Sequence, residues 1–577
     1  MPVEALISTR SYARGPATPL LDLTIGGLLD RTANRFPDRL AVASRHQQKR
    51  LTWAELSAEA DRVARGLWAL GIRRGDRVGL WSTNCIEWVV MHMGCARAGA
   101  ALVNVNPAYR SHELQFTLTR SRMKALFLWH KDKRADYEEI LGRARHGLSL
   151  DLAHTIYFDS PDWPALLDAE GRLPDHVASD DVANIQYTSG TTGLPKGVML
   201  THHNVVNNGQ FLAHGFHYTE QDKIVVPVPL FHCYGCVIGT MSALNSGAAL
   251  ILPNWTFDAR ATLQAIHDER ATSVYGVPAM YVAEFALPEF QSYDTTSLRT
   301  GMMSGAPCPV ELMKRVLEEM HIRELVIAYG QTETSPVVTM SDAADSLEIR
   351  VNTVGRAMPQ TEIKIAAPQA QAASNLAPQA GPNFASTADP NLGPNPATAD
   401  ALPFGQQGEV CVRGYALMKG YDGDPEGTAQ VIQPDGWLRT GDLGVMRQDG
   451  CIHITGRSRD VIIRGGENIY PREVEEFLYT CPKVGEVQVF GIPNARLGEI
   501  VVAWIRLRPG LKPEIDATEQ EIRDFCQGQI AYYKIPEHVR FVDEFPATLS
   551  GKIQKYKMRE FEIEARGLQA VASTTTA

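Results

Sequence analysis

Apolar and polar positions alternate along the first half of the chain in two distinct patterns. Residues 52–70 and 85–98 carry apolar side chains at helical spacing, whereas residues 76–81 and 101–105 are short apolar runs typical of buried strands. Further strand candidates of this kind lie at residues 125–129, 224–228, 248–252, 273–277 and 324–328. Helices that alternate with buried strands are typical of parallel sheets covered by helices, so the pattern predicts an α/β fold.

The pattern is interrupted at residues 366–403, where Ala, Pro, Asn, Gln and Gly dominate. Such a composition cannot bury enough apolar surface to offset the entropy lost on ordering. Because this segment lies between two strand-like runs, TEIKIA and GEVCVRG, it predicts a flexible, expanded hairpin loop without chemistry of its own, and not a domain linker.

Beyond Gly456 the runs of helix and strand predict a small α+β domain, with a helical stretch at residues 519–530. A chain of 577 residues exceeds the roughly 250 to 300 at which a single core stops growing, so at least two domains are expected. We predict a large domain over residues 1–457, which carries the insert, a small domain over 458–566 and a disordered tail over 567–577.

Charge and cysteine content narrow the classes of function. The formal charge is −10 without a basic block, which argues against nucleic acid as the main partner. No apolar run is long enough to cross a bilayer, and the first residues lack the apolar core of a secretory signal, so we expect a cytoplasmic protein.

The nine cysteines are scattered and odd in number, as expected of reduced thiols. Cys233 and Cys236 have C-x-x-C spacing but no second pair to complete a metal site, which favours a structural role.

The run YTSGTTGLPKGVMLTH, from Tyr187 to His202, concentrates glycines, hydroxyls and one lysine. It is not a Walker A loop, because Pro195 and Gly197 stand where the second Gly and the terminal hydroxyl belong. A strand-like run precedes it, its glycines permit close approach, its hydroxyls can donate, and Lys196 supplies a charge. We therefore predict a polyphosphate-binding loop of another kind, with a merely flexible loop as the alternative.

This loop and several later motifs resemble those of the adenylate-forming enzymes, the superfamily of acyl-CoA synthetases, peptide-synthetase adenylation domains and firefly luciferase. The motifs follow in the family's order: PLFHCYG at Pro229, SGAPCP at Ser304, YGQTETSP at Tyr329, GWLRTGDLG at Gly436, GRSRDVIIRGGENIYPREVE at Gly456 and PATLSGKIQK at Pro546. The resemblance spans the chain from about Leu23 to Glu562. The variants PLFHCYG, SGAPCP and GGENIYP look most like the medium-chain fatty-acyl-CoA synthetase branch.

The resemblance implies a large domain with helix-covered sheets, a small mobile C-terminal α+β domain, and a two-step reaction. A carboxylic acid and ATP give an acyl-adenylate and pyrophosphate, and CoA then takes the acyl group, with Mg²⁺ as cofactor. Lys552 matches the lysine placed between the carboxylate and the α-phosphate, and Thr332 matches a hydroxyl on that phosphate. Glu333 matches the magnesium ligand, for which a single carboxylate plus substrate phosphates is enough. His232 matches a pocket wall near the carboxylate; a structural histidine is the alternative.

The nucleotide site implied by the resemblance draws on five motifs. Tyr329 would stack on adenine, Asp442 would accept hydrogen bonds from the ribose hydroxyls, and Arg457 would approach the ribose or a phosphate. The full set is Thr188, Ser189, Gly190, Thr191, Thr192, Gly193, Lys196, Gly305, Ala306, Pro307, Tyr329, Gln331, Thr332, Asp442 and Arg457.

The small domain would present different faces for the two steps. Arg459 occupies the family's hinge position, where Asp or Lys is more usual, and Gly465, Gly466 and Glu467 would border the channel for CoA. The acyl pocket would be apolar with small residues. Its expected lining is His232, Cys233, Tyr234, Gly235, Met302, Met303, Gly330, Pro336 and Val337.

Several alternatives stay open on the sequence alone. Amino-acid-activating relatives carry an Asp at the position of His232, so amino acids are disfavoured, but chain length and a short-chain or aryl acid are not decided. A ligase that loads a carrier protein and a luciferase-like oxygenase would share the first step. A non-catalytic nucleotide-binding regulator would be expected to lose Lys552 or Glu333, and both are present. Monomer and homodimer are both compatible with the sequence.

Overall fold

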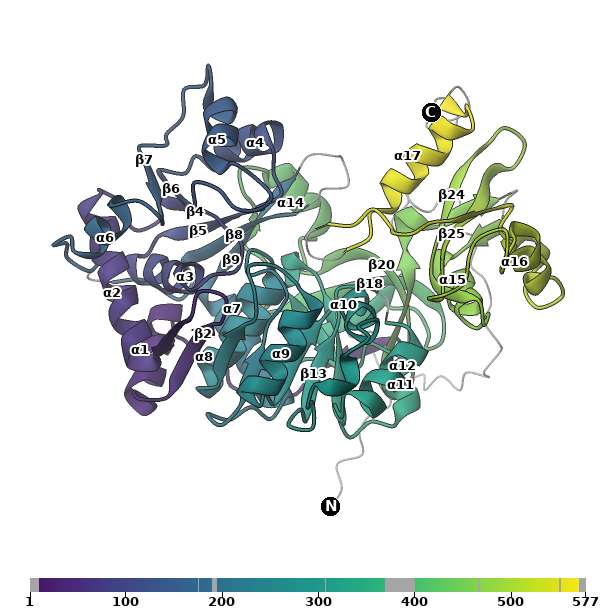
Figure 1. Ribbon diagram of the computed structural model, residues 1–577, viewed down its shortest axis with the longest axis horizontal. Coiled ribbons are helices and arrows are strands. Elements are labelled where there is room, and N and C mark those ends of the chain that lie inside the picture. The colour runs from purple at the N-terminus through teal and green to yellow at the C-terminus, as the bar shows by residue number, and fades with distance from the viewer. Residues whose placement is uncertain are drawn as a thin grey trace.

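The computed structural model describes residues 10–174, 176–188, 195–306, 308–368, 400–464, 467–548 and 552–569. These residues form four β-sheets with helices packed around them (Figure 1). Two sheets are mainly parallel and helix-covered, as the alternating pattern predicts. A third is wholly antiparallel, and a fourth belongs to the C-terminal α+β part. No helix in these ranges is both long and apolar enough to cross a membrane.

The first helix-covered sheet has seven strands in the order β19-β9-β8-β5-β4-β6-β7. Strands β4 to β8 run parallel, and β9 turns back antiparallel to β8. Helices α2 and α3 pack on one face and α4 and α5 on the other. The bounds are β4 Arg77–Trp81, β5 Ala101–Val105, β6 Ala125–Leu128, β7 His154–Tyr157, β8 Val182–Thr188, β9 Lys196–Thr201, β19 Gly420–Tyr421, α2 Trp53–Ala69, α3 Ile86–Ala98, α4 Ser111–Ser121, α5 Tyr137–Arg145 and α6 Asp162–Leu167.

The second helix-covered sheet has nine strands in the order β16-β15-β14-β13-β12-β10-β11-β2-β3. The expected strand at residues 224–228 ends at Val225, because Pro227 and Pro229 cannot donate to a ladder. The bounds are β2 Leu40–Ser44, β3 Lys49–Thr52, β10 Lys223–Val225, β11 Ala249–Leu252, β12 Ser273–Gly276, β13 Thr300–Met303, β14 Glu324–Gly330, β15 Val337–Met340 and β16 Arg356–Ala357. Its helices are α1 Ile25–Arg35, α7 His202–Gly215, α8 Thr240–Ser246, α9 Ala259–Glu269, α10 Pro278–Phe285, α11 Val310–Glu319 and α12 Leu347–Asn352.

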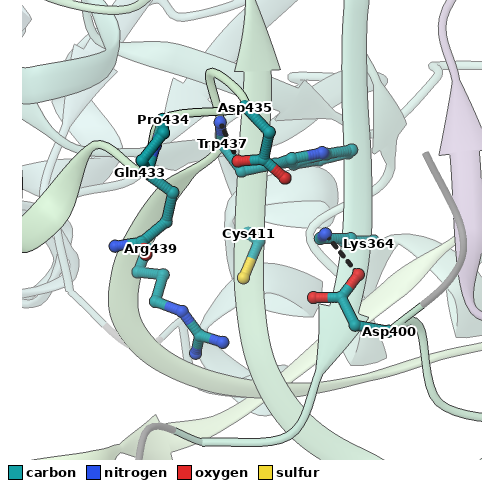
Figure 2. A pocket seen from close by; sticks show the side chains of 8 residues that line it. All are labelled: Lys364, Asp400, Cys411, Gln433, Pro434, Asp435, Trp437 and Arg439. Atoms are coloured by element: carbon teal, nitrogen blue, oxygen red, sulfur yellow. Dashed lines mark hydrogen bonds and ion pairs between the residues drawn. The ribbon is translucent and has the colours of Figure 1, made fainter. Parts of the chain in front are cut away.

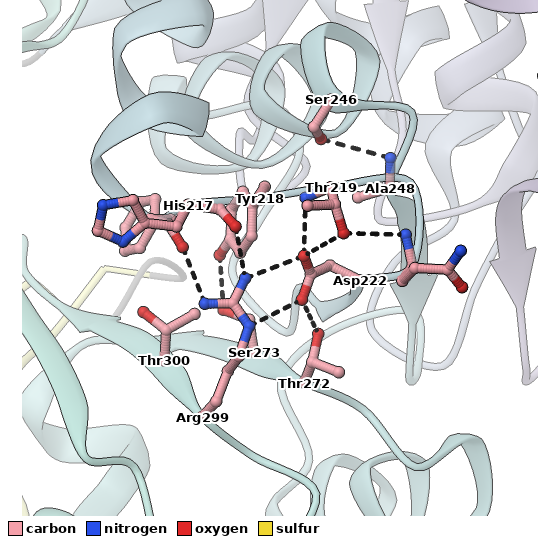
Figure 3. Close-up of polar contacts among 12 residues, drawn as sticks. His217, Tyr218, Thr219, Asp222, Ser246, Ala248, Thr272, Ser273, Arg299 and Thr300 are labelled. Carbon is pink, nitrogen blue, oxygen red and sulfur yellow. Dashed lines mark hydrogen bonds and ion pairs between the residues drawn. The ribbon is translucent and has the colours of Figure 1, made fainter. Parts of the chain in front are cut away.

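An ion pair between the half-buried Arg299 and the buried Asp222 lies at the edge of this sheet where its parallel strands begin (Figure 3). Arg299 donates to both carboxylate oxygens of Asp222, at 3.1 and 2.9 Å, and Thr272 donates to the same group at 2.7 Å. Burial alone would raise the pKa of Asp222, but the hydrogen bonds from Arg299, Thr219 and Thr272, together with the charge of Arg299, outweigh it and the pKa is lowered. The carboxyl ends of the parallel strands lie at the opposite edge, where loops are free to form a site.

The antiparallel sheet, in the order β1-β17-β18-β20-β21, was not predicted by the alternating pattern. Strands β17 and β18 pair antiparallel with Ala366 opposite Glu409, so the predicted hairpin around the insert is confirmed. Residues 369–399 of the insert lie outside the described ranges. The bounds are β1 Tyr12–Arg14, β17 Thr361–Ala366, β18 Gln407–Gly414, β20 Leu438–Met446 and β21 Ile452–Arg457, with helix α14 Pro425–Val431 between β19 and β20.

The C-terminal α+β part lies at one end of the molecule (Figure 1). The expected helix at residues 519–530 is α16, which ends at Cys526. Arg472 at the start of α15 donates to the carbonyl of Ile454 in β21 at 2.8 Å and so contacts the large part. The bounds are β22 Ile462–Arg464, β23 Glu467–Ile469, β24 Val484–Asn494, β25 Gly498–Leu507, β26 His538–Phe541, α15 Pro471–Tyr479, α16 Glu519–Cys526 and α17 Lys555–Ala565. The exact domain limits stay predictions.

Candidate active site

The predicted phosphate-binding loop lies between two antiparallel strands, β8 and β9. Thr188 and Lys196 face each other across its base. Helix α7 begins only at His202, at the far end of β9, with the Thr201 side chain as its cap. The loop is therefore followed by a strand and not by a helix N-terminus. This agrees with the prediction that it is not a Walker A loop. Ser189, Gly190, Thr191, Thr192 and Gly193 lie outside the described residues.

The YGQTETSP motif leaves the end of β14 in a tight turn. Thr332 is 8% exposed, and its Oγ1 lies 3.7 Å from the Sγ of Cys233, so this motif meets the PLFHCYG motif. A Cβ on Gly330 would stand 1.8 Å from the carbonyl oxygen of Pro336, and one on Gly235 would stand 2.4 Å from that of Pro229. Both glycines are thus required by the close packing of their own turns. Gln331 shapes the same turn, since its N–H donates to the hydroxyl of Thr334 at 3.1 Å.

Glu333 is held by a residue that the sequence analysis did not single out. Tyr421 donates its hydroxyl to Oε1 of Glu333 at 2.9 Å, and the Nζ of Lys196 lies 4.8 Å from the centre of the Tyr421 ring. Lys196 also approaches Oδ2 of Asp424 at 3.9 Å. The phosphate-loop lysine and the predicted magnesium ligand therefore share one neighbour.

The donor set fits a magnesium ion that completes its coordination with ATP. Across the described ranges, no group of three or more His, Cys, Asp and Glu side chains could hold a metal ion by itself. Mg²⁺ needs only one or two carboxylates when substrate phosphates and water supply the remaining oxygens. Glu333, with its carboxylate at the turn between β14 and β15, meets that requirement.

The predicted ribose end forms a compact polar cluster. Asp442 is 5% exposed and accepts hydrogen bonds from the hydroxyl of Tyr329 at 2.7 Å and from Nε of Arg457 at 3.0 Å. Burial, reinforced by Asp442, raises the pKa of Tyr329 well above its usual value. Burial opposes the charge on Arg457, but Asp442, Asp460 and Tyr329 together outweigh it and the pKa of Arg457 is raised. Strands β14, β20 and β21 thus bring three predicted site residues together.

The predicted adenine wall follows β13. Gly305 has a φ of +84°, which favours glycine, and a Cβ there would lie 3.2 Å from Val277. Gly305 is exposed and Ala306 half-buried, so the backbone of this loop faces open space. Pro307 lies outside the described residues.

Lys552 of the small domain acts electrostatically on His232 of the large one. Burial, and after it the positive charge of Lys552, lowers the pKa of His232 to about 4. The imidazole is therefore neutral at pH 7. A short hairpin holds Lys552, whose N–H donates to Oγ1 of Thr548 at 3.1 Å and whose carbonyl accepts from the N–H of Thr548 at 2.8 Å.

Four residues of the predicted acyl wall are brought together, and Met303 is separated from them. Tyr234, Met302 and Val337 are buried in the same hydrophobic core, and Cys233 packs against it. The hydroxyl of Tyr234 donates to the carbonyls of Gly276 and Met302, at 3.1 Å each, so its ring forms an apolar wall. Met303 instead packs in a separate core on the other face of the sheet, because neighbouring residues of a strand point to opposite faces.

The predicted hinge and CoA residues lie between β21 and β23. Arg459 is in the short 3₁₀ turn Ser458–Asp460. Gly465 and Gly466 lie outside the described residues, and the exposed Glu467 opens β23 opposite Arg464. Within the described part of the chain, Glu467 makes no side-chain hydrogen bond to a nucleotide-site residue.

A separate cavity of about 260 Å³ lies on the antiparallel sheet, away from these groups (Figure 2). Lys364 pairs with Asp400 at 2.5 Å, and the Trp437 ring lies 4.4 Å from Nζ of Lys364. Arg439 donates to the carbonyl of Ala367 at 3.1 Å. The cavity is therefore built where the chain enters and leaves the insert.

Comparison with known proteins finds two matching families. The AMP-binding enzyme family matches residues 29–375, and the AMP-binding enzyme C-terminal domain matches residues 473–552. The putative acyl-CoA synthetase YngI of Bacillus subtilis is 42% identical, over 96% of this chain and 99% of its own length. The mitochondrial medium-chain acyl-CoA ligase ACSF2 of Bos taurus is 39% identical, over 95% of this chain and 89% of its own. The crystal structure of ATP-bound MatB from Rhodopseudomonas palustris is 28% identical with a TM-score of 0.78, covering 93% of this chain and 99% of that one.

Proposed function

The chain belongs to the family of AMP-binding enzymes, and on that premise we propose that it is a fatty-acid–CoA ligase. It uses ATP to convert a carboxylic acid, of medium chain length, into an acyl-adenylate and then transfers the acyl group to CoA, giving acyl-CoA, AMP and pyrophosphate. Two relatives at 42% and 39% identity, named as an acyl-CoA synthetase and a medium-chain acyl-CoA ligase, support this assignment.

The observation that carries the proposal is that the positive charge of Lys552, in the small domain, helps to lower the pKa of the buried His232 in the predicted acid-binding wall. Adenylation brings an anionic carboxylate to an anionic α-phosphate, so a cation aimed at both lowers the barrier. Lys552 supplies that cation, while the neutral His232 beside it adds no charge. Since no carboxylate takes the place of His232, the wall offers no counter-ion for an ammonium group, which favours acids without an amino group.

On the nucleotide side we assign the remaining roles by position. Lys196 and the hydroxyl of Thr332 bind phosphates, Tyr329 stacks on adenine, and Asp442 accepts the ribose hydroxyls. Because Tyr329 and Arg457 already donate to Asp442, ribose binding requires the carboxylate to share or exchange these donors. Glu333 holds Mg²⁺, which would stabilise negative charge on the phosphates when bound.

The second half-reaction needs a different face of the small domain in the same site. We propose that the domain turns about Arg459 and brings the loop that contains Glu467 toward CoA. The short turn Ser458–Asp460, between the two parts, supports this hinge position. We also propose a cytoplasmic location, supported by the nine cysteines, all of which are free thiols.

The proposal is tested by pyrophosphate release with ATP and Mg²⁺ across straight-chain, branched and aryl carboxylates, each with and without CoA. We expect release to peak with straight chains of medium length and to yield a CoA thioester. Release that yields acyl-adenylate but no CoA thioester would indicate that the acyl acceptor is a carrier protein and not CoA. No release with any acid would contradict the assignment as a ligase.

A further inference from the structure

One short segment, residues 418–424, joins the two loops on which adenylation depends. At its start, the N–H of Met418 donates to the carbonyl of Glu333 at 2.9 Å. Further along, Tyr421 pairs with Val198 of β9, and the N–H of Asp422 donates to the carbonyl of Gly197 at 2.7 Å. The segment is therefore hydrogen-bonded at one end to the turn that carries Glu333 and at the other to the strand that begins with Lys196.

Tyr421 is the residue of this segment whose side chain contacts both functional groups. Its side chain is almost fully buried, with 8% of the residue exposed. Its hydroxyl donates to Oε1 of Glu333 at 2.9 Å, and its ring faces Nζ of Lys196 at 4.8 Å.

The backbone of Tyr421 is held in position by hydrogen bonds to the start of helix α14. Its N–H donates to Oγ1 of Thr428 in α14 at 2.9 Å, and its carbonyl accepts from the N–H of Asp424 at 3.1 Å. Asp424 caps α14 by accepting from the N–H of Gly427 at 2.8 Å, while its other carboxylate oxygen lies 3.9 Å from Nζ of Lys196. The lysine thus lies between an aromatic face and a carboxylate that are both anchored to α14.

We propose that Tyr421 is a positioning residue for adenylation, which orients Glu333 toward the divalent cation and holds Lys196 beside it before ATP binds. This inference rests on the proposed function. A carboxylate has two equivalent oxygens, and a hydroxyl committed to one of them leaves the other with a defined direction for the metal. The aromatic face holds the ammonium of Lys196 without neutralising it, so the lysine remains a charge that phosphates can recruit.

Two substitutions distinguish the contribution of the Tyr421 hydroxyl from that of its ring. Tyr421→Phe keeps the ring beside Lys196 and removes the donor to Glu333, whereas Tyr421→Leu removes both. Binding of Mn²⁺ in the presence of a non-hydrolysable ATP analogue is measured by electron paramagnetic resonance, and binding of the analogue alone is measured in EDTA. Loss of a group that orients a metal ligand typically weakens metal binding by roughly 10- to 100-fold, which is the loss we expect for Tyr421→Phe.

In EDTA, Tyr421→Phe should bind the analogue like the unchanged protein, and Tyr421→Leu should bind it more weakly because Lys196 is no longer held. Tyr415→Phe is the matched control, since Tyr415 is a half-buried tyrosine whose hydroxyl accepts a hydrogen bond from the amide of Asn208 at 3.1 Å. This control should leave Mn²⁺ binding unchanged. A loss of Mn²⁺ affinity in the control equal to that in Tyr421→Phe would attribute the effect to general loosening and overturn the proposal.

A double-mutant cycle makes the test independent of the overall reaction. In the Glu333→Gln background, Tyr421→Phe should cause no further loss of Mn²⁺ affinity, because both changes remove the same interaction. Full additivity of the two losses, or wild-type Mn²⁺ binding in Tyr421→Phe alone, would overturn the positioning role. These binding measurements are read without any carboxylic acid, so an enzyme that fails to release pyrophosphate with every acid would contradict the proposed ligase and leave this result standing.

Discussion

At the residue scale, the candidate site is organised by charges that come from distant parts of the sequence. Lys552 lies in the small domain and His232 in the large one, yet the lysine lowers the pKa of the histidine. A neutral histidine beside a lysine keeps positive charge concentrated on one group. That arrangement suits a step in which two anions must be brought together.

We predict that Lys552→Ala abolishes adenylation while sparing the transfer of a supplied acyl-adenylate to CoA. Adenylation needs the cation between carboxylate and phosphate, whereas the second step starts after that charge problem has been solved. The measurement is pyrophosphate release from acid and ATP, compared with thioester formation from synthetic acyl-adenylate. Lys557→Ala is the control, because Lys557 is exposed on the following helix. Unchanged pyrophosphate release in Lys552→Ala would remove the catalytic assignment of this lysine.

The grouping of candidate site residues could be predicted where short motifs carry them and not where contact depends on the fold. The sequence placed Tyr329, Asp442 and Arg457 in one site, and the structure joins them by hydrogen bonds. Tyr421 was missed because its contact with Glu333 spans 88 positions and follows from the pairing of β19 with β9. Met303 was grouped with Met302 although consecutive strand residues face opposite sides, a signal that strand alternation could have supplied.

At the scale of elements, the position of the Lys552 hairpin depends on how α17 begins. Lys555, the first residue of α17, donates to Oε1 of Glu475 in α15 at 2.6 Å and to the carbonyl of Val489 in β24 at 2.9 Å. Across the hairpin that carries Lys552, the N–H of Gln554 donates to the carbonyl of Pro546 at 2.8 Å. Lys555, three residues after Lys552, is thus anchored to both β24 and helix α15.

We predict that Lys555→Met slows adenylation by roughly 10- to 100-fold, the range expected when a reacting group is displaced by about 1 Å. The methionine side chain fills similar space but cannot donate to Glu475 or Val489, so the hairpin should lose its fixed position. Single-turnover formation of acyl-adenylate measures the effect, with Lys557→Met as the matched control. Adenylation at the wild-type rate, in a variant that folds normally, would show that the Lys555 anchor does not position Lys552.

The central strands of the helix-covered sheets could be predicted from the sequence, because they are continuous apolar runs, whereas edge strands such as β3 (KRLT) and β16 (RA) are not. The antiparallel sheet could not. Its strand β1 pairs with β17, with Tyr12 opposite Lys364, and nothing local in either segment indicates that partner. The hairpin of β17 and β18 was predictable because the insert separates two recognisable strands.

At the scale of the whole molecule, buried neutral histidines make the fold sensitive to acid. Burial lowers the pKa of His92 to about 3 and that of His202 to about 4, from an ordinary 6.5. The unfolded chain therefore binds protons that the folded chain excludes. These groups leave stability independent of pH above about 6.5, and stability is lost as the pH falls from there toward about 4.

We predict that His92→Leu makes the free energy of unfolding depend less steeply on pH below about 6.5. The slope should fall by up to about 1.4 kcal/mol per pH unit, the contribution of one proton. The substitution should cost little at pH 8, because Nδ1 of His92 is buried and has no hydrogen-bond partner among the described residues. Urea unfolding between pH 8 and pH 5 measures the slope, with the exposed His112→Leu as control. An unaltered slope in His92→Leu would mean that His92 does not take up a proton on unfolding.

The residues on either side of the insert between β17 and β18 pair with each other directly, so the fold does not depend on the insert to hold them together. Ala366 pairs with Glu409 and bridges Ala401, and Lys364 pairs with Asp400. Deleting residues 370–395 should therefore leave turnover nearly unchanged and alter the free energy of unfolding by no more than about 1 kcal/mol, since loop entropy depends only weakly on length. Replacing the same residues by a Gly/Ser stretch of equal length is the matched control. If turnover falls in both variants, the sequence of the insert contributes to function; if it falls in the deletion alone, its length does; and if it falls in neither, the predicted inert loop stands.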